Sequence, residues 1–152
     1  MRKQITSALL GLATLFVLAA AAHAQTAQGI AVQVPFDFVA GQRRLAAGRY
    51  IVRRVGSDSG SALLIQSADG RSAAVVFTAE GESSPRAAQV VFRRRGESFF
   101  LASVSVPGAP SVREVPESRA EKKLAEELAR RAKSGAPDAA VKTVALAGEV
   151  RQ

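Results

Sequence analysis

Clusters of arginine are the residues of this chain whose type and spacing best suit binding chemistry. A guanidinium group offers a planar fork of N–H donors that matches phosphate and carboxylate groups. If the clusters meet in space, they could bind an anionic envelope polymer or a lipid head group. They could instead provide solubility and keep strand edges from pairing with other chains, and both interpretations stay open. The candidate anion-binding residues are Arg53, Arg54, Arg93, Arg94 and Arg95.

The chain has few residues suited to catalysis, because it contains one histidine, His23, and no cysteine. These residue types supply most general bases, thiol nucleophiles and zinc ligands. Carboxylates remain, and a convergent pair could hydrolyse a polysaccharide. They lie in segments that resemble turns or polar strand faces, so we expect no catalytic, cofactor-binding or metal-binding residue; a carboxylate-dependent polysaccharide hydrolase is the alternative. The carboxylates considered for it are Asp37, Asp58, Glu80 and Glu82.

The first 24 residues have the pattern of a secretory signal peptide. Arg2 and Lys3 precede an uncharged apolar run at residues 8–22, and Ala22-His23-Ala24 offers small residues at the cleavage site. The run is shorter than the roughly 20 residues of a membrane-spanning helix, which makes a retained anchor the lesser alternative. Cleavage after Ala24 would leave a periplasmic or secreted protein with no transmembrane segment and a net charge of +6. Export also separates the protein from most nucleic acid, so we expect no nucleic-acid partner.

Short stretches of alternating apolar and polar residues dominate residues 29–106. A period of two is typical of a strand with one buried face, and one such stretch runs from Val32 to Phe38. Pro35 lacks a backbone N–H, which favours a sheet edge or a bulge there. Asp69-Gly70 and Arg95-Gly96-Glu97 favour hairpin turns between neighbouring stretches. The sequence therefore predicts a mainly β fold, an antiparallel β-sandwich or partly open barrel, with one C-terminal α-helix.

The character of the sequence changes after residue 106. Residues 107–117 contain prolines and a glycine and are expected to form a linker. Ser118 and Glu121 have the spacing of a capping box, which predicts an amphipathic helix over residues 118–133. Its apolar stripe is narrow and mostly alanine, so we expect the helix to pack shallowly on the β domain or to stand partly free. Residues 134–152 are predicted to be a flexible tail, with a short strand near residues 141–146 as the alternative.

A motif at the start of the β domain resembles a family of small exported bacterial β-rich proteins of uncharacterised function. The chain carries Val34-Pro35-Phe36-Asp37-Phe38, then Gly41, then Leu45-Ala46-Ala47-Gly48-Arg49-Tyr50, where the family pattern is VPFxF, a glycine turn and L(P/A)AGxY. Ala46 stands where proline is usual. The resemblance implies a β-rich fold with a C-terminal helix, and it implies no activity.

These features together predict the class of protein. We expect an exported, basic, non-enzymatic domain with a binding or structural role at the cell envelope. Its expected partner is an anionic envelope polymer or another envelope protein, with no cofactor.

Overall fold

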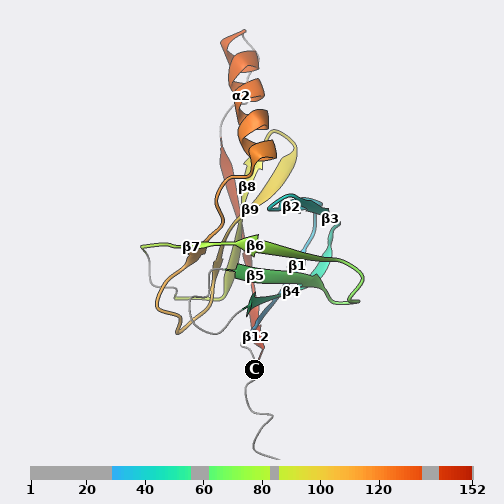
Figure 1. Cartoon of the computed structure of the whole chain (residues 1–152), viewed down its shortest axis with the longest axis vertical. Helices are drawn as coiled ribbons and strands as arrows, with labels where there is room; N and C mark the ends of the chain where they lie inside the picture. The colour runs from blue at the N-terminus through green and yellow to red at the C-terminus, as the bar shows by residue number, and fades with distance from the viewer. Residues whose placement is uncertain (1–28, 56–61, 83–85, 135–140, 152) are drawn as a thin grey trace, which may run out of the picture.

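The computed structural model describes residues 29–55, 62–82, 86–134 and 141–151, which form two β-sheets and one helix (Figure 1). The predicted signal peptide lies outside these residues. The first sheet has the order β12-β1-β4-β5-β6. Its strands are β1 (Gly29–Val34), β4 (Gly48–Val55), β5 (Ala62–Ser67), β6 (Ala73–Phe77) and β12 (Glu149–Arg151).

The second sheet has the order β11-β8-β9-β10-β7, and the β2–β3 hairpin joins it through β2 and β9. The β2–β9 pairing is parallel, and the other pairings of the described strands are antiparallel. These pairings do not close into a barrel, so the predicted mainly β fold is confirmed in its sandwich form. The strands are β2 (Phe38–Ala40), β3 (Arg43–Leu45), β7 (Ala79–Glu80), β8 (Gln89–Arg95), β9 (Ser98–Ser105), β10 (Arg113–Glu114) and β11 (Lys142–Ala147).

The core lies between the sheets and is centred on aromatic side chains. The ring of Phe38 lies edge-on to Tyr50 at 5.1 Å and to Phe92 at 5.2 Å between ring centroids. Phe36 stacks on Phe99 with centroids 3.9 Å apart. Such offset and edge-on contacts add to the free energy gained by burying the rings. The aromatic residues of the VPFxF motif thus have a packing role.

The predicted hairpins are present where turn chemistry favours them. β5 pairs with β6 across Asp69-Gly70, and β8 pairs with β9 across Gly96-Glu97. Gly70 and Gly96 have φ angles of 73° and 57°, which L-residues with side chains rarely adopt.

The prediction of a single strand from Val32 to Phe38 is wrong, because β1 ends at Val34 and the next strand, β2, begins at Phe38. β1 belongs to the first sheet and β2 to the second. Pro35 cannot donate to a ladder, and the chain crosses between the layers at this point. β1 is also not an edge strand, since it lies between β12 and β4. Just before β2, Oδ1 of Asp37 accepts the N–H of Ala47 at 3.0 Å, which fixes the turn before β4.

The predicted linker and flexible tail both contribute strands, so these boundaries are corrected. β10 lies within residues 107–117 and pairs with β9 and β7. β11 pairs with β8, and β12 pairs with β1. The C-terminal segment therefore joins both sheets, with Gly148 between its two strands. The alternative of a short strand near residues 141–146 is what the structure shows, while residues 135–140 lie outside the described part.

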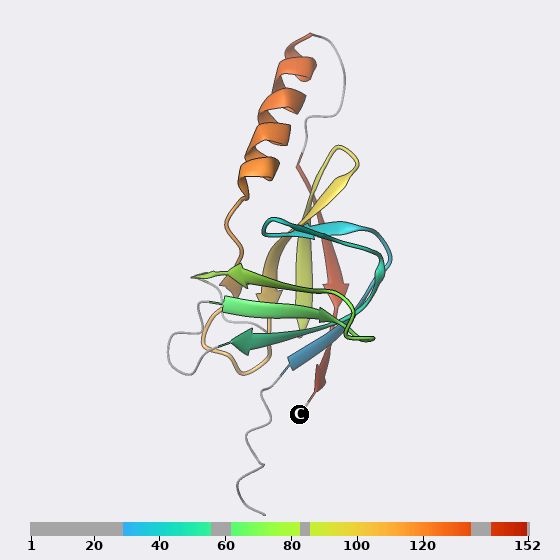
Figure 2. The same cartoon turned by 45° about the vertical axis from the view of Figure 1, so that its right-hand side comes forward.

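The helix α2 (Arg119–Lys133) follows the N-cap Ser118, close to the predicted bounds of 118–133. It extends beyond the end of the sheets, on the side of the β8–β9 turn (Figures 1 and 2). Glu121 is its one buried residue, so the expected shallow packing is present. The structure contains, within its described residues, no helix with the length and apolar character that crossing a membrane requires.

Candidate anion-binding site

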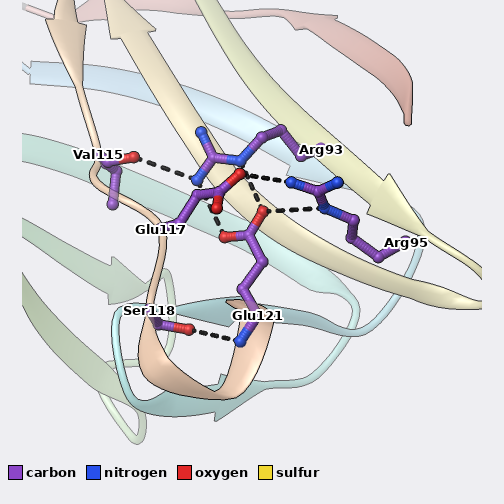
Figure 3. A network of polar contacts seen from close by, with 6 residues as sticks. All are labelled: Arg93, Arg95, Val115, Glu117, Ser118 and Glu121. Atoms are coloured by element: carbon purple, nitrogen blue, oxygen red, sulfur yellow. Dashed lines mark hydrogen bonds and ion pairs between the residues drawn. The ribbon is translucent and has the colours of Figure 1, made fainter. Parts of the chain in front are cut away.

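Arg93 lies near the end of β8 and is bound by the first turn of α2 (Figure 3). Its Nε donates to Oε1 of Glu121 at 2.7 Å, and its Nη2 donates to Oε2 of Glu121 at 3.0 Å and to the Val115 carbonyl at 3.1 Å. This fork is the strong bidentate form of an arginine–carboxylate pair. The hydrogen bonds that Arg93 donates to the Glu121 carboxylate raise the pKa of Arg93 above its usual value, so the guanidinium stays charged.

Arg95 also lies close to Glu121 and to a second carboxylate, that of Glu117. Its Nη2 donates to Glu117, while its Nε lies 3.5 Å from Oε1 of Glu121 without forming a hydrogen bond (Figure 3). Two arginines and two glutamates thus form one network between β8 and the start of α2. Their charges balance one another, which leaves little to attract an external anion.

Arg94 faces away from this network. Its Nε donates to the Gly96 carbonyl at 2.8 Å, and its guanidinium carbon lies 5.7 Å from the ring centroid of Phe99, within cation–π range. Arg93 and Arg95 thus share one network, and Arg94 has contacts of its own. The geometry does not favour them as an anion-binding cluster.

Arg53 and Arg54 lie on β4 in the other sheet, and no hydrogen bond or ion pair of the described residues joins them to Arg93–Arg95. The structure brings them instead to Arg113, a residue that the sequence did not single out. All three line one pocket, to which strands of both sheets contribute. The full lining is Val52, Arg53, Arg54, Leu63, Val104, Val106, Ala109, Ser111 and Arg113.

Arg113 is a buried cation, with 7% of its surface exposed. It stands opposite the buried Val104 in the β9–β10 register, so its side chain lies on the inner face of the sheet. Its Nη2 lies 3.3 Å from Oε1 of Glu80, a largely exposed carboxylate. Its Nε has no hydrogen-bond partner, and neither does the buried Oγ of Ser111. Buried polar atoms without partners are rare in folded proteins, and a water molecule or another acceptor would satisfy these two.

The pocket is cationic and narrow. Its lining holds three arginines and no carboxylate. Its volume is about 10 Å³, which is room for roughly one water molecule.

The carboxylates considered for hydrolysis do not form a catalytic pair among the described residues. Asp37 accepts the Ala47 N–H and lies 3.5 Å from Arg44, and Glu80 is paired with Arg113. Glu82 is exposed, and Asp58 lies outside the described residues. None of the described Asp and Glu residues joins a group of three or more that could hold a metal ion.

A second cavity of about 490 Å³ lies along β9 and β10. Glu114 is the one carboxylate in its lining, beside Arg93 and Ser103. Retaining and inverting glycosidases both need two carboxyl groups, so this cavity does not support hydrolysis.

Arg113 has no signal in the sequence that separates it from a solvated arginine. It lies in a segment flanked by proline and glycine, where charged residues are usually exposed. Its burial depends on β10 pairing with β9 and β7, which no local pattern indicates.

Comparisons of the chain with protein-family models, with curated proteins and with solved structures found no match.

Proposed function

We propose that this protein is an exported, non-enzymatic domain that binds an anionic component of the cell envelope through Arg53, Arg54 and Arg113. The observation that carries the proposal is the buried guanidinium of Arg113, whose Nε lacks a partner inside a pocket lined by two more arginines. Export rests on the signal-like residues 1–24. An envelope partner follows from export, since anionic polymers and lipid head groups are abundant there.

The chemistry of the pocket favours phosphate or carboxylate groups. Burying a guanidinium without full pairing costs stability, so a ligand oxygen near Arg113 Nε and Ser111 Oγ would relieve that cost. Arg53 and Arg54 are exposed and would add positive charge around the pocket. Binding should weaken steeply with added salt, because exposed charges are screened.

The proposal is tested by binding of the mature chain, from Gln25 onward, to two probes. The first is soluble polyphosphate, and the second is vesicles of phosphatidylglycerol compared with phosphatidylcholine. Polyphosphate alone would indicate a polymer partner, and phosphatidylglycerol vesicles a lipid partner. We expect Arg53→Gln/Arg54→Gln to weaken binding by about tenfold or more, equivalent to about 1.4 kcal/mol.

The matched control is Arg86→Gln/Arg119→Gln, which removes the same charge from two exposed arginines outside the pocket. It should change affinity by less than about twofold. Equal losses in the two double variants would indicate attraction by net charge alone and would refute the site. Export is tested separately, by N-terminal sequencing of the secreted protein, which should begin at Gln25.

A further inference from the structure

The outer face of the first sheet is formed by alternate residues of β4, β5 and β6. The residues between them, such as Val52, Ile65 and Val76, are buried in the core, so their neighbours along each strand point outward. The strand registers place the outward residues in three rows across the sheet. The rows are Ile51, Gln66 and Ala73; Arg53, Leu64 and Val75; and Val55, Ala62 and Phe77.

Large apolar side chains are exposed on this face. Val55, Val75 and Phe77 are 43%, 56% and 76% exposed, and the half-buried Ala62 and Leu64 lie between and beside them in the rows. In Figure 2 the strands β4, β5 and β6 lie in front of the second sheet, and no other helix or strand lies in front of them. A contiguous exposed apolar surface is typical of an interaction site.

Arginines stand on the same face toward β12. In the two registers of β1, Gly29 lies opposite both Arg151 of β12 and Arg53 of β4. The row that ends at Val75 therefore begins with two exposed arginines, which are separated by a residue without a side chain. Neither arginine forms an ion pair within the described part of the chain.

The net charge of this face is positive. Among the described strands of the first sheet, Glu149 supplies the one carboxylate. Its Oε2 lies 3.4 Å from Nη2 of Arg49, so these two charges offset one another. Arg53 and Arg151 remain as unpaired charges. The face thus has a basic half near β12 and an apolar half near β6.

We propose that this face binds the surface of an anionic lipid bilayer, with Val75 and Phe77 at the acyl chains and the arginines at the lipid phosphates. Attachment to a bilayer surface strengthens with buried apolar area and with attraction of cations to anionic lipids, and this face supplies both. A soluble polyanion would match the arginines and leave the apolar rows exposed. A second copy of the chain would bring the same unpaired positive charges to the interface, where like charges repel.

This proposal rests on the export and the anionic envelope partner of the proposed function. It also shares Arg53 with the arginine pocket. Val55, Val75 and Phe77 do not line that pocket, so changes to these side chains test the lipid-binding face alone.

Phe77→Trp places a reporter on the face, because the chain has no tryptophan of its own. With phosphatidylglycerol vesicles, the fluorescence of this variant of the mature protein should shift to shorter wavelength. Lipids brominated in their acyl chains should quench it. The control is Val141→Trp, since Val141 is 48% exposed and directly precedes β11 of the other sheet. Vesicles should leave the fluorescence of the control unchanged, and soluble polyphosphate should leave both variants unchanged.

Val75→Thr/Phe77→Thr should weaken binding to phosphatidylglycerol vesicles by at least about tenfold, because it removes apolar area that the bilayer would bury. Threonine keeps a preference for strands, so the sheet should be retained. The matched control is Val141→Thr/Val150→Thr, which changes two exposed valines outside the three rows. It should alter vesicle affinity by less than about twofold.

The basic half of the face is tested with Arg151→Gln, which lies outside the arginine pocket. It should weaken vesicle binding by roughly fivefold, the usual contribution of one cation at an anionic bilayer. Arg119→Gln removes the same charge from the start of α2 and should change vesicle binding by less than about twofold. Phosphatidylcholine vesicles should bind the wild type at least about tenfold more weakly than phosphatidylglycerol vesicles.

Three results would overturn the proposal. They are an unchanged Phe77→Trp fluorescence with phosphatidylglycerol vesicles, an equal shift of Val141→Trp, and a wild-type dimer without vesicles that Val75→Thr/Phe77→Thr converts to a monomer. The last result would assign the face to a second copy. Val75→Thr/Phe77→Thr should leave polyphosphate binding unchanged, whereas Arg53→Gln/Arg54→Gln should weaken it. Failure of the lipid-binding face is therefore distinguishable from failure of the arginine pocket.

Discussion

Arg93 and Glu121 form a two-point ion pair that fastens the start of α2 to the end of β8. The two contacts are 2.7 and 3.0 Å long, and Glu121 is 1% exposed. Glu121 has the position of a capping-box glutamate, yet its carboxylate bonds to arginines of the sheet. The pair therefore sets where the helix stands on the sandwich.

Glu121→Gln should destabilise the protein by about 3 kcal/mol, because it leaves two guanidinium groups beside a buried amide. The free energy of unfolding is measured by urea denaturation, followed by circular dichroism. The control is Glu126→Gln, which removes a carboxylate that lies 3.7 Å from Arg130 on the exposed face of the helix. The control should lose less than about 0.5 kcal/mol. A similar small loss for Glu121→Gln would show that the network does not stabilise the fold.

The sequence predicts the parts of this fold that depend on neighbours in the chain. The Asp69-Gly70 turn and the ion pair between Glu127 and Arg131 are local, because a turn type or a helical repeat determines them. Arg93 and Glu121 are 28 residues apart. Arg93 belongs to a basic cluster and Glu121 to the start of a helix. Neither local pattern indicates that the two side chains meet.

The same limit explains the missed strands and the missed site residue. β11 has the sequence KTVALA and β12 only the three residues EVR, which give a weak strand pattern, so their pairing with β8 and β1 depends on tertiary contacts. Arg53 and Arg54 were predicted as candidates because they are adjacent. Arg113 joins them only once the two sheets pack.

Ser118→Ala should weaken the first turn of α2. Oγ of Ser118 accepts the N–H of Glu121 at 3.1 Å, and losing such a cap costs about 1 kcal/mol. Amide hydrogen exchange at Glu121 should become roughly five times faster. In the control, Ser134→Ala removes a hydroxyl that donates to the Arg130 carbonyl at the other end of the helix. It should leave exchange at Glu121 unchanged, and an equal effect of both changes would exclude a local capping role.

Ionisation of Tyr50 should lower the free energy of unfolding at alkaline pH. Its hydroxyl donates to the Ala46 carbonyl at 2.7 Å, and burial, with smaller contributions from Asp69 and Asp37, raises the pKa of the phenol above its usual value of 10.0. A pKa raised by folding gives stability that is complete below pH 10 and is lost as pH rises through the folded value. Urea denaturation at increasing pH should show this loss.

Tyr50→Phe is the control for that dependence. It should lower stability at neutral pH by about 1 kcal/mol, through the lost hydrogen bond, and flatten the alkaline decline. Tyr50 is the one tyrosine of the chain, which has no tryptophan, so near-ultraviolet absorbance follows its ionisation directly. Half-ionisation at or below pH 10 in the folded protein would contradict the raised pKa.

Gly148→Ala should show that the C-terminal strands are part of the sandwich. Gly148 joins β11 of one sheet to β12 of the other, and its N–H bonds to the Ala88 carbonyl at 2.9 Å. A Cβ added there would lie 2.1 Å from Cγ2 of Ile30, which is fully buried and cannot move aside. Such overpacking costs about 1–3 kcal/mol, measured by urea denaturation.

The control for this change is Gly48→Ala, whose added Cβ would meet its nearest neighbour, Cε2 of Tyr50, at 3.7 Å, an ordinary contact. It should change stability by less than about 0.5 kcal/mol. Ile30→Ala removes the atom that Gly148→Ala meets, so the double variant should lose less than the sum of the two single losses. Additive losses would mean that the β11–β12 junction does not press on Ile30. Because that contact is the point where the C-terminal segment crosses the core, additivity would also argue that β12 contributes little to the stability of the first sheet.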